Sequence, residues 1–168
     1  MQRFFFFSVV LLLGLVACSD RQPAVQSNTM KVIFDWQGHR GARGILPENT
    51  VPAFLKALEY PVTTLELDLA VSRDSQLVVS HEPWMSHHIC RHPDGRAVTE
   101  AEEDSLLIFQ LSYEEVRQFD CGSRGNARFP EQEALATGKP TLDEVVEAVR
   151  AYCEREGREL PAYNIEIK

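Results

Sequence analysis

One segment limits the possible folds of this chain more than any other feature. Between residues 64 and 71, three leucines on one side alternate with Glu66, Asp68 and Ala70 on the other. Alternation with a period of two predicts a β-strand. Burying an unpaired carboxylate costs several kcal/mol, so the acidic side must either face water or hold a cation. In a barrel that side would point inward, and two carboxylates two residues apart would bind a cation. The alternative is a solvated face, as in an antiparallel edge strand.

Short strands and helices alternate around this segment. Helices are expected to begin after Thr50, Ser112 and Thr141, each of which can cap a helix N-terminus. Long irregular stretches are expected at 82–111 and 122–138, where proline, glycine and acidic residues gather. The strands are expected at 32–36, 64–71, 76–80 and 163–168. This alternation predicts the α/β class, with a parallel sheet covered by helices.

Composition argues against several other classes of protein. The chain has 168 residues and is 44% hydrophobic, which suits one globular domain. Its 17 basic and 25 acidic residues give a formal charge of −8, unlike the basic surface of a nucleic-acid-binding protein. Four cysteines are too few for a disulfide scaffold. No segment after residue 17 is apolar for long enough to cross a bilayer.

The first thirty residues are predicted to lie outside the folded domain. A basic Arg3 and an apolar run over 4–16 are typical of a secretory signal. The run ends in Leu-Val-Ala-Cys18, which resembles the lipobox of bacterial lipoproteins, whose cysteine is lipidated. We therefore expect a signal peptide at 1–17, a lipidated Cys18 with a polar tether at 18–30, and a domain at 31–168. This predicts an exported lipoprotein of a bacterial cell envelope, in the periplasm or outer membrane. An uncleaved membrane anchor is the alternative.

Residues suited to phosphate chemistry lie at the ends of the predicted strands. His39 and Arg40 follow the first strand and His81 follows the third, and strand ends are where the active sites of barrels gather. Histidine transfers protons near neutral pH, and arginine contacts phosphate with two donors. The last strand adds Glu166 and Lys168 on one side. Carboxylates beside basic groups suit a hard divalent ion and an anionic substrate.

The remaining cysteines and histidines carry weaker signals. A soft-metal site is superficially suggested by His87, His88, Cys90 and His92. We interpret this segment as a polar loop, because it has no Cys-x-x-Cys pair. A disulfide between Cys90 and Cys121 is a hypothesis, since export permits one. Cys153 lies on the apolar face of a predicted helix and is expected to be a buried thiol.

In combination, these motifs resemble those of the glycerophosphodiester phosphodiesterases. The resemblance spans residues 38–168, and its motifs come in the family's order and at the family's spacing. It is carried by Gly-His-Arg-Gly-Ala-Arg-Gly at 38–44, Pro-Glu-Asn-Thr at 47–50, Glu-Leu-Asp at 66–68, Val-Val-Ser-His at 78–81, Pro-Thr-Leu-Asp-Glu-Val at 140–145 and Glu-Ile-Lys at 166–168. One departure is Glu82, which follows His81 where many members have aspartate.

The resemblance implies a (β/α)₈ barrel of the TIM type and a set of site residues. Such barrels take about 250 residues, so this chain would be the N-terminal half, about four β/α units, as a fragment or as a short product. The implied reaction is hydrolysis of a glycerophosphodiester to glycerol 3-phosphate and an alcohol. The implied roles are acid/base catalysis by His39 and His81, binding of Ca²⁺ or Mg²⁺ by Glu66, Asp68 and Glu166, phosphate contact by Arg40 and Lys168, and shaping of the pocket by Glu48 and Asn49.

Three alternatives stay open at this point. Paired carboxylates also hydrolyse glycosides, although His39, Arg40 and Lys168 suit a phosphate better. A non-catalytic lipoprotein would keep the ligands and bind a metal or phosphoester without turnover. A phospholipase D-like member of the same superfamily would act on lysolipids.

Overall fold

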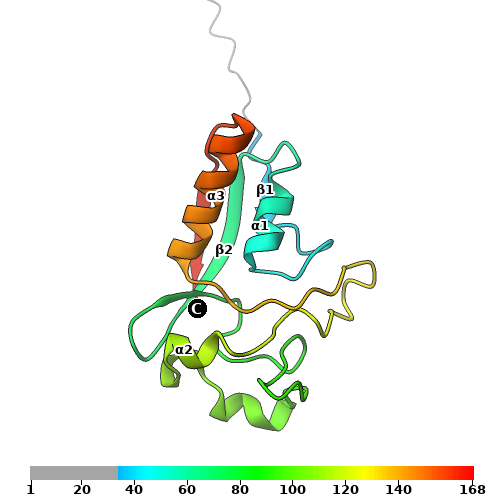
Figure 1. Cartoon of the computed structure of the whole chain (residues 1–168), viewed down its shortest axis with the longest axis vertical. Helices are drawn as coiled ribbons and strands as arrows, with labels where there is room; N and C mark the ends of the chain where they lie inside the picture. Colours follow the sequence, from blue (N-terminus) through cyan, green and yellow to red (C-terminus); the bar gives the residue numbers. More distant parts are fainter. Residues whose placement is uncertain (1–33) are drawn as a thin grey trace, which may run out of the picture. The chain divides into compact units, whose positions relative to one another are not determined.

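The sheet is built around one strand, β2 (Thr64–Val71), which pairs with the three other strands (Figure 1). The computed structural model describes residues 34–168, so the predicted signal peptide (1–17), Cys18 and the tether (18–30) lie outside the described residues. In chain order the other main elements are β1 (Gln37–His39), α1 (Val51–Ala57), β3 (Leu77–Val79), α2 (Tyr113–Val116), α3 (Leu142–Glu156) and β4 (Ala162–Ile167). Within residues 34–168, no helix has the length and apolar character needed to cross a membrane.

The strand pairing confirms the α/β class with a parallel sheet. β1 and β4 run parallel to β2 along its opposite edges, since Thr64 pairs with both Gln37 and Ala162. One detail of the expectation was wrong, because the strand predicted at 76–80 is antiparallel to the end of β2. The reason is the length of the connection. A parallel strand needs a crossover of a dozen or more residues, whereas only residues 72–76 separate β2 from β3.

The first strand also lies later in the chain than predicted. The apolar run predicted the strand at 32–36, but among the described residues pairing begins only at Gln37. Before it, the Asp35 carboxylate accepts hydrogen bonds from the hydroxyls of Thr63 and Thr64, which fixes the start of β2 instead of extending β1. Phe34 and Trp36 remain largely exposed, so the sheet does not bury the described part of this apolar run.

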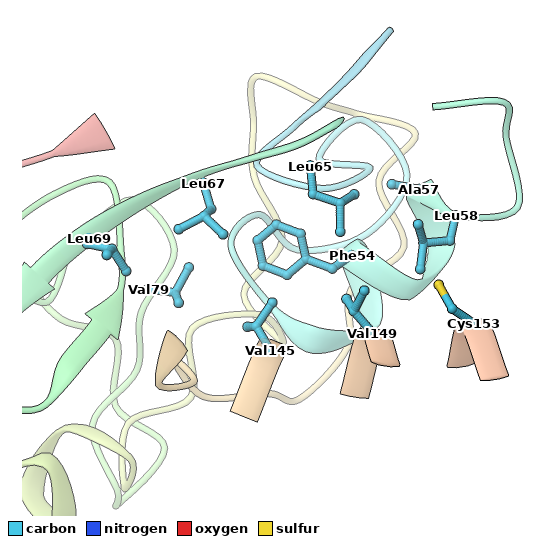
Figure 2. Packing of buried hydrophobic residues seen from close by; sticks show 10 residues of the cluster. All are labelled: Phe54, Ala57, Leu58, Leu65, Leu67, Leu69, Val79, Val145, Val149 and Cys153. Carbon is cyan, nitrogen blue, oxygen red and sulfur yellow. The ribbon is translucent and has the colours of Figure 1, made fainter. Parts of the chain in front are cut away.

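Helices α1 and α3 cover the leucine side of β2. Thr50 caps α1 by accepting a hydrogen bond from the backbone N–H of Ala53. Thr141 and Glu144 form the predicted capping box of α3, and Gly157 ends that helix with a left-handed φ of 63°. Figure 2 shows the core between these elements, which contains Phe54, Ala57, Leu58, Leu65, Leu67, Leu69, Val79, Val145, Val149 and the expected buried thiol Cys153.

The opposite side of β2 leads into a second core. Ala70 follows Glu66 and Asp68 on that side and packs with the long segment between β3 and α3. The part predicted to be irregular, 82–111, holds two short 3₁₀ helices, η1 (Glu100–Ser105) and η2 (Ile108–Gln110), and the helix predicted after Ser112 is α2. A disulfide between Cys90 and Cys121 joins two points of the segment within the core. The second core therefore packs the segment between β3 and α3 against Ala70, on the acidic side of β2.

Removing this disulfide should destabilise the domain. The bond closes a loop across a sequence separation of 31, and loop-closure entropy predicts that it contributes about 3–4 kcal/mol. We expect a Cys90→Ala/Cys121→Ala variant to lose about that much free energy of unfolding in a urea titration. As a control, reductant should destabilise the wild-type chain but leave the double variant unchanged. Equal stability of both chains without reductant would contradict the prediction.

Candidate active site

The end of β1 and the turn that follows it bring His39 and Arg40 to the acidic side of β2. Arg40 and Gly41 both have left-handed backbones, with φ of 53° and 76°. This turn lets the Arg40 backbone N–H donate to Glu66 Oε2 over 2.8 Å. His39 Nε2 lies 3.7 Å from the same carboxylate oxygen. A Cβ on Gly41 would lie 2.6 Å from the carbonyl carbon of Ala53 in α1, so only glycine fits this approach.

Asp68 is the buried centre of the site. Its side chain is 1% exposed and lies against groups from three segments. Arg40 Nε is 3.2 Å from Asp68 Oδ2, and the Asn49 amide donates to the same oxygen over 2.9 Å. Lys168 Nζ lies 3.1 Å from Asp68 Oδ1. Arg40 also contacts Glu48, with 2.8 Å between Nη1 and Oε1.

These partners keep the buried carboxylate charged. Burial raises the pKa of Asp68, but the hydrogen bond from Asn49 and the charges of Lys168 and Arg40 outweigh it and hold that pKa below its ordinary value. Lys168 Nζ is also 2.7 Å from Glu166 Oε1. Burial works against the charged ammonium, but these two carboxylates raise the pKa of Lys168. Asp68 and Lys168 are therefore both charged at neutral pH.

Three carboxylates form a cluster that fits a divalent ion. Glu66, Asp68 and Glu166 each offer one oxygen, and these oxygens lie within 4.8 Å of one another. The register of β2 and β4 pairs Asp68 with Glu166, which explains why strands so far apart in sequence share the cluster. Among residues 34–168, no donor reaches the buried Asp68 Oδ1 with hydrogen-bond geometry. Carboxylate oxygens with spare acceptor capacity are the ligands that Ca²⁺ and Mg²⁺ prefer.

The histidine-rich segment is occupied by other contacts. Cys90 is in the disulfide, and His87 Nδ1 lies 2.8 Å from Glu103 Oε1. Within the described residues this segment forms no metal-binding group with His, Cys, Asp or Glu. Ile89 and Cys90 of this segment are buried in the second core, so the segment is not polar throughout.

His81 reaches the site through the β2–β3 hairpin. The Ser80 backbone N–H donates to the Asp68 carbonyl over 2.9 Å, so the residue before His81 lies against the Asp68 backbone. His81 Nδ1 is 2.9 Å from Glu82 Oε1. A buried lysine, Lys139, donates to the Ser80 hydroxyl over 2.7 Å.

Sequence reasoning missed Lys139 and gave Glu82 no role in the site. One signal for Lys139 was available, since a cation directly before the N-terminus of α3 opposes the helix dipole. Direct contacts join eight of the predicted site residues into one network, namely His39, Arg40, Glu48, Asn49, Glu66, Asp68, Glu166 and Lys168. The predicted His81 contacts Glu82 instead. Asn126 is an addition near Glu48, at 3.5 Å from Nδ2 to Oε2.

Comparison with known proteins identifies the family. Residues 39–167 match the model of the glycerophosphoryl diester phosphodiesterase family, which is most of the chain. The chain belongs to this family. The motifs on which the sequence resemblance depends lie within or directly beside the matched range.

Relatives in this family share the sequence and the fold. The chain is 29% identical over 111 residues to a glycerophosphodiester phosphodiesterase from Caldanaerobacter subterraneus, which covers 66% of this chain and 38% of the relative. A crystal structure from Silicibacter pomeroyi, described as a candidate glycerophosphoryl diester phosphodiesterase, is 31% identical with a TM-score of 0.71 over 81% of this chain and 46% of that one.

A phosphodiesterase from Oleispira antarctica was solved in complex with the product sn-glycerol-3-phosphate. It is 25% identical with a TM-score of 0.56, over 81% of this chain and 45% of that chain. The chain thus spans about half the length of these solved relatives, whose TIM barrels it matches in part.

Substitution of Gly41 should affect the fold more than substitution of a comparable glycine. Gly41 and Gly95 both have positive φ, but a Cβ on Gly95 would meet nothing within 4 Å. We expect Gly95→Ala to lower the free energy of unfolding by about 1–2 kcal/mol, the cost of a left-handed alanine. Gly41→Ala should lose clearly more, because its Cβ collides with the α1 backbone. Urea unfolding of both variants tests this, and equal losses would contradict the close approach.

Proposed function

We propose that this chain carries the N-terminal part of a metal-dependent hydrolase that converts glycerophosphodiesters to glycerol 3-phosphate and an alcohol. The observation that carries the proposal is the convergence on Asp68 of two other carboxylates and two cations, Arg40 and Lys168. An acidic cluster alone suits a metal ion. The two cations beside it favour a substrate that is itself an anion, such as a phosphodiester.

Glu66, Asp68 and Glu166 would hold the ion, as Ca²⁺ or Mg²⁺. When bound, a divalent ion neutralises the charge of a phosphate that otherwise repels a nucleophile. The presence of sn-glycerol-3-phosphate in the Oleispira relative supports glycerophosphodiesters as the substrate class.

The cations are assigned to the phosphate oxygens. Arg40 is held between Glu48 and Asp68, so its guanidinium is oriented before substrate arrives and loses little entropy on binding. Lys168 would contact the phosphate from the other strand. In this proposal, Glu48 and Asn49 shape the pocket by fixing Arg40 and Asp68.

The two histidines supply the proton transfers. His39 is the last residue of β1 and His81 lies two residues after β3, so the two histidines come from separate segments. One would remove the proton of the attacking hydroxyl group, and the other would protonate the leaving alcohol. Two separately positioned histidines suit a reaction in which one proton is taken up and another is released.

Variants of the two histidines should lose turnover but keep metal binding. We expect His39→Ala and His81→Ala each to lower the release of glycerol 3-phosphate from glycerophosphocholine by about 100-fold or more, with calcium binding retained in calorimetry. Glu66→Gln should lower both the release of glycerol 3-phosphate and the affinity for calcium. His87→Ala, at a histidine outside the site, is the control and should change neither.

Other outcomes would favour the alternatives. Near wild-type rates from both site-histidine variants would end the acid/base assignment. Binding of the ion with no product would favour a non-catalytic lipoprotein. Hydrolysis of lysophosphatidylcholine or of an aryl glycoside instead would favour the phospholipase D-like or glycosidase alternative.

We also propose that the protein is a lipoprotein of a bacterial cell envelope. The support is the apolar run over 4–16 followed by Leu-Val-Ala-Cys18. Expressed in a bacterium that processes lipoproteins, the full chain should incorporate labelled palmitate and enter the membrane fraction, and Cys18→Ser should abolish the labelling. Equal labelling of the two chains would contradict lipidation at Cys18.

A further inference from the structure

Lys139 is a buried cation without an assigned task. It is 5% exposed, although lysine is almost never buried unless it is paired. Its position follows from the sheet, since the Val79 backbone N–H donates to the Pro140 carbonyl over 2.8 Å and holds this segment beside the end of β3. Burial lowers the pKa of Lys139, while the charges of Glu82, Glu48 and Asp68 oppose that shift.

A chain of contacts leads from Lys139 to His81. The Lys139 ammonium donates to Ser80 Oγ over 2.7 Å. The Ser80 hydroxyl uses its own proton to donate to the Glu82 carbonyl over 2.6 Å. Glu82 Oε1 then lies 2.9 Å from His81 Nδ1. Lys139 thus restrains the backbone of Glu82 through Ser80.

The charge of Lys139 acts on the same glutamate. Burial raises the pKa of Glu82, but the hydrogen bond with His81 and the charge of Lys139 hold that pKa below its ordinary value. An ionised carboxylate only accepts hydrogen bonds, so His81 must donate from Nδ1. In the neutral ring, the free lone pair is then on Nε2.

We propose that Lys139 is a positioning residue, which acts through Ser80 and Glu82 to hold His81 in the tautomer with a free Nε2. The inference rests on the proposed function, in which His81 is one of the acid/base pair. Ser80 holds the Glu82 backbone through its carbonyl, and the charge of Lys139 acts on the Glu82 carboxylate.

The test replaces Lys139 and measures by NMR which ring nitrogen of His81 carries the proton. In the full chain, ¹⁵N NMR of His81, assigned by comparison with His81→Gln, should show the proton on Nδ1. Lys139→Met should move a large share of that proton to Nε2 and lower kcat by about 10- to 100-fold, with KM changed less than twofold. Lys56→Met, at a lysine paired with Glu59 away from the site, should change neither.

A double-mutant comparison distinguishes positioning from general stability. Glu82→Ala should shift the tautomer by itself, and adding Lys139→Met to it should shift the tautomer no further. If Lys139→Met does not fold, Ser80→Ala breaks the same chain of contacts and should give the same NMR change. An unchanged Nδ1 proton in whichever of the two variants folds would overturn the proposal. The NMR result stands even if the wild-type chain releases no glycerol 3-phosphate, so the two proposals fail separately.

Discussion

The neutralisation of one buried carboxylate is the constraint on which the rest of the structure depends. Asp68 is almost fully enclosed, and an isolated charge in that position would cost several kcal/mol. Arg40 and Lys168 balance its charge, and the Asn49 amide donates a hydrogen bond to it. Arg40 and Asn49 come from the loop after β1, and Lys168 directly follows β4. The pairing of both parallel strands with β2 is what brings these groups within reach. Formation of the sheet and formation of the site are therefore the same process.

The sequence predicted features whose signal is local. The alternation over 64–71 predicted β2 to the residue, and the side chains of Thr50, Ser112 and Thr141 marked the starts of α1, α2 and α3. The predicted position of β1 was wrong, because pairing of Gln37 with Thr64, and not apolar character, decides where that strand begins. Lys139 was missed because its burial depends on Ser80, which lies 59 residues away in the sequence. Predicted motif residues share one site, but their roles stay predictions.

The two sides of β2 differ in what they carry. One side packs into an apolar core, and the other carries the acidic residues of the candidate site. The leucine side is closed by α1 and α3 into an apolar core (Figure 2). The acidic side begins with Glu66 and Asp68 and passes, at Ala70, into the second core that the disulfide closes. The candidate site therefore lies at the border of a rigid apolar layer. The apolar layer supports the charged groups from the leucine side of β2.

The parallel pairing of β4 with β2 also has a consequence for the order of folding. Asn49 lies 19 residues before Asp68, whereas Lys168 lies 100 residues after it. Contacts between distant parts of a chain carry the larger loop-closure entropy and form slowly. A chain emerging from the ribosome can form the hairpin and the first amide contact well before the last strand exists. The ammonium that completes the charge balance directly follows β4, so the site is assembled only after β4 has paired with β2.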